Sequence, residues 1–276
     1  MIKIYAFADE ASSMIDGQIA AMLRNGLQGL EIRGVDGVTV SNITLEKAKE
    51  VKKKLDDAGL VTGSVGSPIG KIPIDGDFAE HLDKLKHTLE IADILGTKNL
   101  RMFSFFMPKD EDPATYRNKV MDQLAAMAEL AAPTGIALCH ENEKGIYGDN
   151  APRCLDILKS VPQLKCVFDP ANFVQCGQDT MEAWDLLGDR VYYMHIKDAL
   201  ADGFVVPAGK GIGNVEKIVK AYIAKGGSHF TIEPHLSLFD GLAGLEQDGE
   251  RSQIAYRYPD ADTAFDVACS AFKELS

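Results

Sequence analysis

The stretch ALCHENEKGIYGDN, residues 137–150, begins with a short apolar run and then gathers a histidine, two glutamates and two asparagines within a few positions. An apolar run of this length is typical of a buried strand. Polar side chains that crowd its end either cap a turn that faces water or face a site where charge is used. The rest of the chain helps to decide between these two interpretations.

Short apolar runs of the same kind alternate with helix-period segments along the whole chain. Strands are predicted at 2–8, 28–32, 60–65, 98–103, 136–140, 164–168, 191–195 and 229–232. Helices are predicted at 15–25, 44–58, 77–95, 113–131, 151–160, 179–187, 214–225 and 261–274. This alternation favours parallel βα units. It predicts an α/β fold, a (β/α)₈ TIM barrel forming a single domain over residues 1–276, with a doubly wound open sheet as the alternative.

Residues that start or stop helices support these boundaries. Thr44 precedes one predicted helix, and Pro113 is expected in the first turn of another. Glycines follow four expected last turns: Gly26, Gly59, Gly96 and Gly135. His81 and His87 fall on a helix face and are expected to be solvated.

The composition is that of an ordinary globular protein, with 46% hydrophobic and 25% charged residues among 276. Lys+Arg number 29 and Asp+Glu 41, so the net charge is −12. A partner held by phosphate neutralisation, such as a nucleic acid, is therefore not expected.

Three features of the sequence predict a cytoplasmic protein. Asp9 and Glu10 interrupt the first apolar stretch where a signal peptide would continue, and no apolar run reaches the roughly 18 residues of a membrane span. The cysteines number five, are scattered and form no CxxC pair. This pattern suits reduced thiols better than disulfides or a zinc–thiolate site.

The carboxyl ends of barrel strands supply the active site, so the residue types there carry the functional prediction. Glu141, Asp169, His195 and Glu233 occupy four such ends in the second half of the chain. A single carboxylate after a strand usually caps a helix or ends in solvent, but four ligand-type residues at successive ends are less easily explained that way. Three carboxylates at one spot would repel one another unless a cation lay between them. The set predicts one divalent metal ion, Mn²⁺ first, with Mg²⁺, Co²⁺ or Zn²⁺ as alternatives.

Seven short motifs carry a family resemblance over nearly the whole chain. They are FADEAS (7–12), LEIRG (30–34), GSPIGK (66–71), HENE (140–143), VFDPAN (167–172), MHIKD (194–198) and TIEPH (231–235). Their order and spacing resemble the xylose-isomerase-like barrel superfamily of sugar isomerases and epimerases. Within it, the ketose 3-epimerases hold one metal by Glu, Asp, His and Glu. The resemblance places these ligands at Glu141, Asp169, His195 and Glu233.

The resemblance implies an isomerase that transfers a proton at a carbon next to a carbonyl in a small sugar or sugar phosphate. The metal would stabilise the enediolate that develops. Glu141 and Glu233 would remove and return the proton from opposite sides of the sugar. Return on the opposite face is epimerisation, and return to the neighbouring carbon is aldose–ketose isomerisation.

Other residues have expected supporting roles. Asn172 can hydrogen-bond a sugar hydroxyl or orient Asp169, and His235 can reach substrate or line a loop. Asp198 is expected to hold the His195 ring, with a backbone carbonyl as the alternative. Three cations are candidates to bind an anionic substrate, with a solvated surface charge as the alternative for each: Arg33, Lys71 and Lys210.

Two positions depart from the ketose 3-epimerases and leave the substrate open. Tyr147 stands near the place of a substrate-contacting glutamate, and Asn172 stands where those enzymes usually carry histidine. A different ketose, a sugar phosphate, an inosose or a hydroxy-keto acid are all candidate substrates.

Three other functions compete with the isomerase. An inosose dehydratase-type lyase uses the same proton abstraction and then expels a hydroxyl. An apurinic-site endonuclease, a DNA-repair enzyme, shares the barrel but needs three zinc ions and additional histidines. A non-catalytic sugar-binding barrel has no need of two opposed carboxylates.

The segment 236–257, LSLFDGLAGLEQDGERSQIAYR, is long for a βα loop. Loops of this length are usually functional or mobile. Phe239, Leu242 and Leu245 suit either a cover over the barrel mouth or a contact with a second subunit. A homo-oligomer, dimer or tetramer, is expected.

Overall fold

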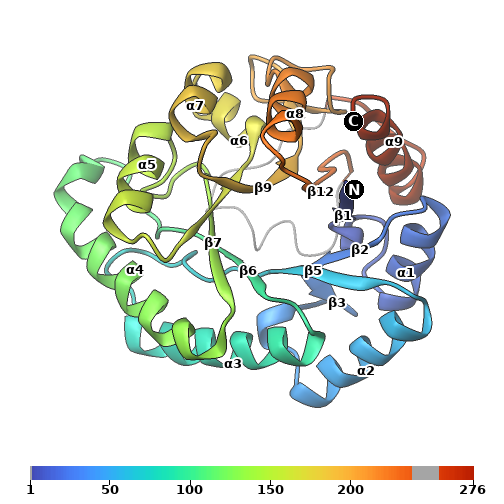
Figure 1. Ribbon diagram of the computed structural model, residues 1–276, viewed down its shortest axis with the longest axis horizontal. Coiled ribbons are helices and arrows are strands. Elements are labelled where there is room, and N and C mark those ends of the chain that lie inside the picture. The colour runs from blue at the N-terminus through green and yellow to red at the C-terminus, as the bar shows by residue number, and fades with distance from the viewer. Residues whose placement is uncertain (1, 238–254) are drawn as a thin grey trace.

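Eight parallel strands close into a barrel in the computed structural model, which describes residues 2–237 and 255–276 (Figure 1). The strands are β1 (Lys3–Ala6), β2 (Gly29–Ile32), β5 (Val61–Gly66), β6 (Asn99–Met102), β7 (Ala137–Glu141), β8 (Lys165–Phe168), β9 (Val191–Ile196) and β12 (His229–Ile232). Strand β1 pairs with both β2 and β12, so the barrel has no free edge. The predicted (β/α)₈ barrel is confirmed, and the open sheet is excluded.

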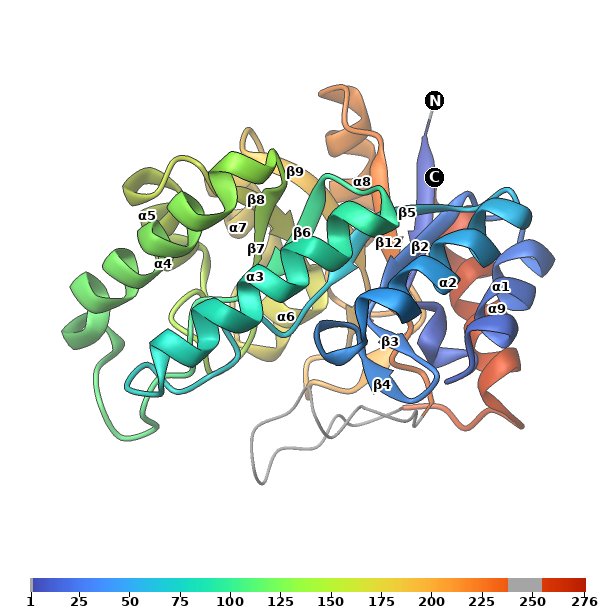
Figure 2. The same ribbon diagram turned by 90° about the horizontal axis from the view of Figure 1, so that it is seen from below.

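Helices surround the barrel in chain order (Figure 1). They are α1 (Ile15–Arg24), α2 (Leu45–Asp57), α3 (Phe78–Leu95), α4 (Arg117–Ala131), α5 (Ala151–Ser160), α7 (Thr180–Leu187), α8 (Val215–Ala224) and α9 (Ala261–Lys273). The short helix α6 (Pro170–Gln175) follows β8 directly. Two small hairpins add β3 (Gly34–Val35) with β4 (Val38–Thr39), and β10 (Asp198–Ala199) with β11 (Val205–Val206). Figure 2 shows α6 and the β3–β4 hairpin toward the end of the barrel opposite the N-terminus.

The helix boundaries follow local chemistry. The Thr44 hydroxyl accepts a hydrogen bond from the Lys47 amide at the start of α2, as the sequence predicts. Gly96 ends α3 in the left-handed conformation, with φ 77°. The prediction around Pro113 was partly wrong, because residues 113–116 form a 3₁₀ turn and α4 begins at Arg117.

The prediction that His81 is solvated was wrong. His81 is buried, and its Nε2 accepts a hydrogen bond of 2.8 Å from the amide of Gly70. His87 is partly buried, with its Nε2 2.8 Å from the carbonyl oxygen of Ile43. Through these contacts, each ring links α3 to a loop that connects a strand with a helix.

Alternation along the strands divides the core into two layers. Outward side chains such as Leu30, Val65 and Phe230 join the large apolar cluster between strands and helices. The barrel interior is polar by contrast, with buried ionisable groups hydrogen-bonded across it. They include Glu31, Arg101, Tyr193 and His195. A polar interior of this kind favours a functional site in the barrel over a purely apolar core.

A β-bulge shifts the pairing of β2 with β5. Leu30 lies opposite Thr62, whereas Glu31 lies opposite Ser64, so Gly63 is the extra residue. A Cβ atom on Gly63 would lie 2.7 Å from the Tyr5 ring, so this position requires glycine. The bulge places Glu31 beside Ser64 inside the barrel.

Among residues 2–237 and 255–276, no helix has both the length and the apolar character needed to cross a bilayer. Phe239, Leu242 and Leu245 lie outside the described residues.

Candidate active site

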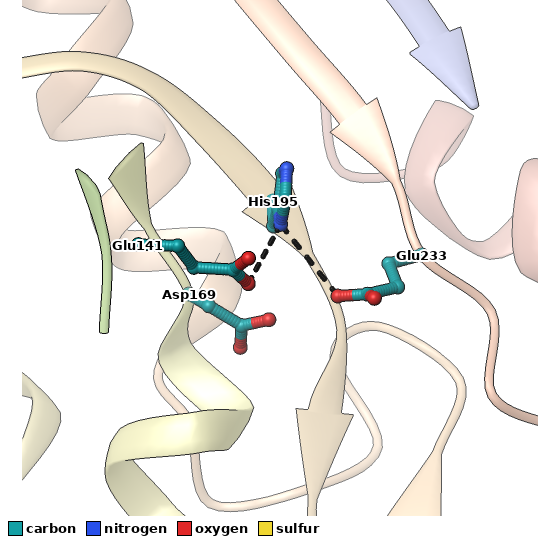
Figure 3. Close-up of side chains that lie close together, drawn as sticks. All are labelled: Glu141, Asp169, His195 and Glu233. Carbon is teal, nitrogen blue, oxygen red and sulfur yellow. Dashed lines mark hydrogen bonds and ion pairs between the residues drawn. The ribbon is translucent and has the colours of Figure 1, made fainter. Parts of the chain in front are cut away.

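Four buried side chains converge at the carboxyl ends of neighbouring strands (Figure 3). Glu141 is the last residue of β7, Asp169 follows β8, His195 lies in β9, and Glu233 follows β12. One ligand atom from each lies within 4.8 Å of the others. The structure thus brings together the four residues that the sequence proposes as metal ligands.

His195 presents Nδ1 to the other members of the cluster. This atom lies 2.8 Å from Glu141 Oε1 and 3.6 Å from Glu233 Oε2. Burial alone would lower the pKa of His195, but the carboxylates of Glu141 and Glu31 raise it well above its usual range. The imidazole is therefore held between glutamates on both sides.

Buried cations contact the carboxylates of the cluster. Lys197 Nζ lies 3.1 Å from Asp169 Oδ2 and 3.0 Å from Glu233 Oε2. Arg101 Nη1 lies 3.1 Å from Glu141 Oε2. Neither cation was singled out from the sequence. Arg101 lies in β6 and Lys197 directly follows β9. Lys197 stands two residues after His195, and this spacing of two is the signal that could have found it.

The pKa values of two cluster carboxylates move in opposite directions. Burial raises the pKa of Asp169 to about 7, although Lys197 acts to lower it. Burial also opposes charge on Glu233, but Lys197, His235 and His195 hold the pKa of that carboxyl well below its usual range. Glu233 is therefore charged at neutral pH.

The donor set fits a divalent metal ion. Three carboxylates and one imidazole offer oxygen and nitrogen ligands of the kind that Mn²⁺, Mg²⁺, Co²⁺ and Zn²⁺ accept. Asp169 Oδ2 is a buried oxygen that accepts no hydrogen bond from the described residues, although Lys197 is close to it. Such an oxygen is suited to coordinate a cation. The buried cluster could hold a metal.

Arg33 and His235 flank Glu233. Arg33 hydrogen-bonds both carboxylate oxygens of Asp9, at 2.9 and 3.0 Å, and contacts Glu10 Oε1 at 3.0 Å. Its Nη1 lies 3.2 Å from Glu233 Oε1. The His235 amide donates to Glu10, and His235 Nδ1 lies 3.7 Å from Glu233 Oε1. The two predicted substrate-binding residues thus lie against a cluster carboxylate.

Asn172 contacts two members of the cluster. Its backbone amide donates to Asp169 Oδ1 at 2.9 Å, which also caps α6. Its side-chain Nδ2 lies 3.3 Å from Glu141 Oε1 and 2.9 Å from the carbonyl oxygen of Asn142. The contact with Asp169 comes from the backbone of Asn172 and the contact with Glu141 from its side chain, so the two roles that the sequence leaves open stay predictions.

The two lysines predicted to bind substrate differ in position. Lys71 is buried, with Nζ 3.2 Å from Glu143 Oε2 and 4.5 Å from the centre of the Phe103 ring. Lys210 is exposed in the turn before α8, where its amide donates to the carbonyl oxygen of Pro207. Lys71 therefore lines the interior, and Lys210 lies at the surface.

The expectation that Asp198 holds the His195 ring was wrong. The carboxylate of Asp198 instead accepts hydrogen bonds of 2.9–3.0 Å from backbone amides of the following loop. The donors are Ala199, Gly209, Gly211 and Gly213. The residue at His195 Nε2 is Glu31, whose Oε2 lies 3.2 Å away. Asp198 shapes the loop, and Glu31, for which the sequence predicted no role, contacts the ring.

The polar residues of 137–150 divide between the two sides of β7. Glu141 faces the cluster, and Asn142 makes a pair of 2.9 Å hydrogen bonds with the backbone of Asp169. His140 points away, with Nε2 2.9 Å from Ser104 Oγ. Asn150 caps α5 by accepting a hydrogen bond from the Arg153 amide. Residues 137–150 therefore supply both a member of the buried cluster and the cap of helix α5.

The cluster lies at the carboxyl ends of the strands of a parallel barrel, which is where characterised TIM-barrel enzymes carry their active sites. The family model for the xylose isomerase-like TIM barrel matches residues 19–248, and the chain belongs to this family. A search of curated proteins finds no match.

Solved structures share the fold at low sequence identity. D-allulose 3-epimerase from Methylomonas sp. is 18% identical, with a TM-score of 0.75, over 100% of this chain and 98% of that one. The probable 3-DHS dehydratase AsbF of petrobactin synthesis from Bacillus anthracis is 17% identical, with a TM-score of 0.75, over 99% of each chain. The IolI protein, solved with a bound zinc atom, is 15% identical, with a TM-score of 0.75, over 100% of this chain and 98% of that one. The structural neighbours thus include epimerases and a dehydratase.

Proposed function

We propose that the protein is a metal-dependent sugar isomerase or epimerase. The observation that carries this proposal is the position of Glu141 and Glu233. Both carboxylates reach the same buried cluster, on opposite sides of His195 (Figure 3). Two opposed carboxylates are what proton removal and return at one carbon require.

The catalytic roles follow from the contacts. A divalent ion bound by Glu141, Asp169, His195 and Glu233 supplies electrophilic stabilisation of an oxyanion next to the reacting carbon. Glu141 and Glu233 exchange the proton with that carbon. Arg101 and Arg33 hold these two carboxylates in place from outside the cluster.

The pairing of the interior cations favours a neutral sugar over a sugar phosphate. Arg33, Arg101 and Lys197 each contact a buried carboxylate, and Lys71 contacts the partly buried carboxylate of Glu143. A phosphate group would have to compete with those carboxylates for the same cations, and breaking a buried ion pair is costly. A neutral keto sugar needs only hydrogen bonds.

We infer Mn²⁺ as the native ion, because three oxygen ligands and one nitrogen suit a moderately hard cation. Zinc is the alternative, supported by the zinc-bound structure of IolI. A cytoplasmic location is proposed from the five cysteines, all free and four of them buried. The proposed partner is a small sugar, with assembly into a homo-oligomer.

Dehydration is the second candidate, favoured by Lys197. Its ammonium group lies within 3.1 Å of two cluster carboxylates, where it can donate a proton to a departing hydroxyl group. The structural similarity to a probable dehydratase supports this candidate. Product mass separates the two, since dehydration removes water and epimerisation does not.

The test combines metal content with proton exchange. The protein is purified without added metal or chelator, and its metal content is compared with that of a His195→Ala variant. We expect one divalent ion per chain, lost in the variant. A panel of neutral ketoses incubated in D₂O should then give one deuterium next to the carbonyl. A protein that binds no metal even after soaking with Mn²⁺ or Co²⁺ would overturn the proposal.

A further inference from the structure

We propose that Glu31 is a positioning residue that selects Nδ1 of His195 as the metal-binding atom. The inference rests on the proposed function, because it concerns the same metal site. Glu31 lies at the carboxyl-terminal part of β2, far in sequence from the cluster, and none of the sequence motifs assigns it a role.

The contacts of Glu31 place it behind His195. Its side chain is fully buried, and its Oε2 lies 3.2 Å from His195 Nε2. On the other side of the imidazole, Nδ1 lies 2.8 Å from Glu141 Oε1. The two ring nitrogens therefore face two different carboxylates, one outside the cluster and one inside it.

The consequence concerns which nitrogen carries the proton. A metal can bind only a ring nitrogen that has no proton, so the proton must be on Nε2 when Nδ1 is the ligand. In the other neutral tautomer, the Nδ1 proton would be donated to Glu141 and would block the metal. Glu31 accepts a hydrogen bond only from a protonated Nε2, so it favours the form that can bind.

Glu31 is itself held in position. The hydroxyl of Tyr193 donates to Glu31 Oε1 at 3.0 Å and lies 3.3 Å from Ser64 Oγ. The bulge at Gly63 places Ser64 opposite Glu31. Both oxygens of Glu31 are thus engaged, and its carboxylate cannot rotate away from His195 without losing the bond to Tyr193.

Contacts with two aromatic rings limit the position of the imidazole as well. Phe7 meets the His195 ring edge-on at 5.1 Å, and Tyr193 lies 5.6 Å from it. These rings restrict where His195 lies but do not distinguish its two nitrogens. In this site the distinction comes from Glu31 on one side and Glu141 on the other.

The experiment compares Glu31→Leu, Glu31→Gln and Tyr193→Phe with the unmodified protein. Leucine removes the acceptor, while glutamine keeps one carbonyl oxygen that can face His195. Tyr193→Phe removes the other partner of Glu31 and leaves the contact with His195, so it controls for general loss of interior packing. Mn²⁺ affinity is measured by calorimetry, and folding is checked by thermal melting. The ¹⁵N shifts of the histidine rings are recorded with and without Zn²⁺, and His195→Gln assigns the His195 signals.

We expect Glu31→Leu to weaken Mn²⁺ binding by about 10- to 100-fold. The Nε2 shift of His195 should move toward the value of an unprotonated nitrogen. Glu31→Gln should recover part of the affinity, and Tyr193→Phe should change it by less than about 3-fold. If Glu31→Leu fails to fold, the partial loss in Glu31→Gln and its ring shifts decide the question.

Two results would overturn the proposal. One is an Mn²⁺ affinity of Glu31→Leu equal to that of the unmodified protein. The other is an equal loss in Tyr193→Phe while the His195 ring shifts keep their original values, which would assign the effect to packing. Both would leave the proposed function intact, because the unmodified protein still binds metal. Failure of the unmodified protein to bind metal would instead contradict the proposed function. The ring shifts of the metal-free proteins would then still show whether Glu31 keeps the proton on Nε2.

Discussion

The ammonium group of Lys197 lies 3.0 Å from Oε2 of Glu233, inside the cluster of carboxylates proposed to bind metal. Its second contact, with Asp169, is 3.1 Å long, and the lysine side chain is only 5% exposed. An internal cation of this kind compensates two buried negative charges. It also repels a divalent ion that enters the same space. We therefore expect Lys197 to set the balance between the metal-free form and the proposed metal-bound form.

Replacing Lys197 by methionine should make the protein more dependent on metal. The metal-free variant should be destabilised by roughly 3–5 kcal/mol, because Asp169 and Glu233 lose a buried counter-charge. Addition of Mn²⁺ should then raise Tm more in the variant than in the unmodified protein, since the ion no longer competes with the ammonium group. Differential scanning calorimetry with and without Mn²⁺ measures both effects. Equal shifts of Tm in the two proteins would contradict this role.

Replacing either Glu141 or Glu233 by glutamine should remove most of the proton exchange with a ketose substrate. Loss of a general base typically lowers the rate by 10²–10⁴-fold. Deuterium incorporation followed by mass spectrometry measures the effect, and metal content measured in parallel separates lost catalysis from lost binding. A variant that keeps its metal and exchanges deuterium at the original rate would exclude that glutamate from proton transfer.

Asp198→Asn should destabilise the protein without weakening metal binding. The Asp198 carboxylate accepts four backbone amides, and an amide side chain presents one acceptor oxygen in place of two. We expect a loss of about 1–3 kcal/mol in unfolding free energy and an Mn²⁺ affinity within about 3-fold of the original. Chemical denaturation measures the unfolding free energy, and calorimetry measures the Mn²⁺ affinity. A loss of affinity as large as that expected for Glu31→Leu would place Asp198 behind His195 after all.

His81 should make stability fall in mild acid. Burial, with a smaller effect of the Lys84 charge, lowers the pKa of His81 from 6.5 to about 4. Protonation of Nε2 would also break the hydrogen bond from the Gly70 amide. The unfolded chain takes up the proton near pH 6.5 and the folded chain only near pH 4. The contribution of neutral His81 to the free energy of unfolding is thus complete above pH 6.5 and is lost as the pH falls toward 4. His81→Gln, which keeps an acceptor, should reduce the loss between these pH values by about 2–3 kcal/mol. Urea unfolding at a series of pH values measures it, and an unchanged pH profile would contradict the assignment.

The barrel and the four cluster residues could be predicted because both depend on local signals. The periods of strands and helices are visible within a few residues of sequence. Glu141 and Glu233 each stand at the point where an apolar run ends. Glu31 and Lys197 were missed for the opposite reason. Each has its charge compensated by a residue from another strand, and only the closed barrel brings those residues together.

The error over Asp198 has the same origin. Its place three residues after His195 suggests a contact, yet its partners are amides of the loop that follows. The residue that does contact the ring, Glu31, is 164 positions away from it in the chain. The bulge at Gly63, which places Ser64 opposite Glu31, is likewise revealed by no pattern of hydrophobicity.

The ion pair between Arg33 and Glu233 joins residues 200 positions apart, and Arg33 also holds Asp9 and Glu10. This has a consequence for the order of events during synthesis. A chain that has emerged only as far as Asp169 carries two of the four proposed ligands, and His195 and Glu233 are still missing. The final strand, β12, must join β1 before the site exists. We therefore expect the proposed metal ion to be captured only at the end of folding, because a fragment that ends at Asp169 lacks half of the proposed site.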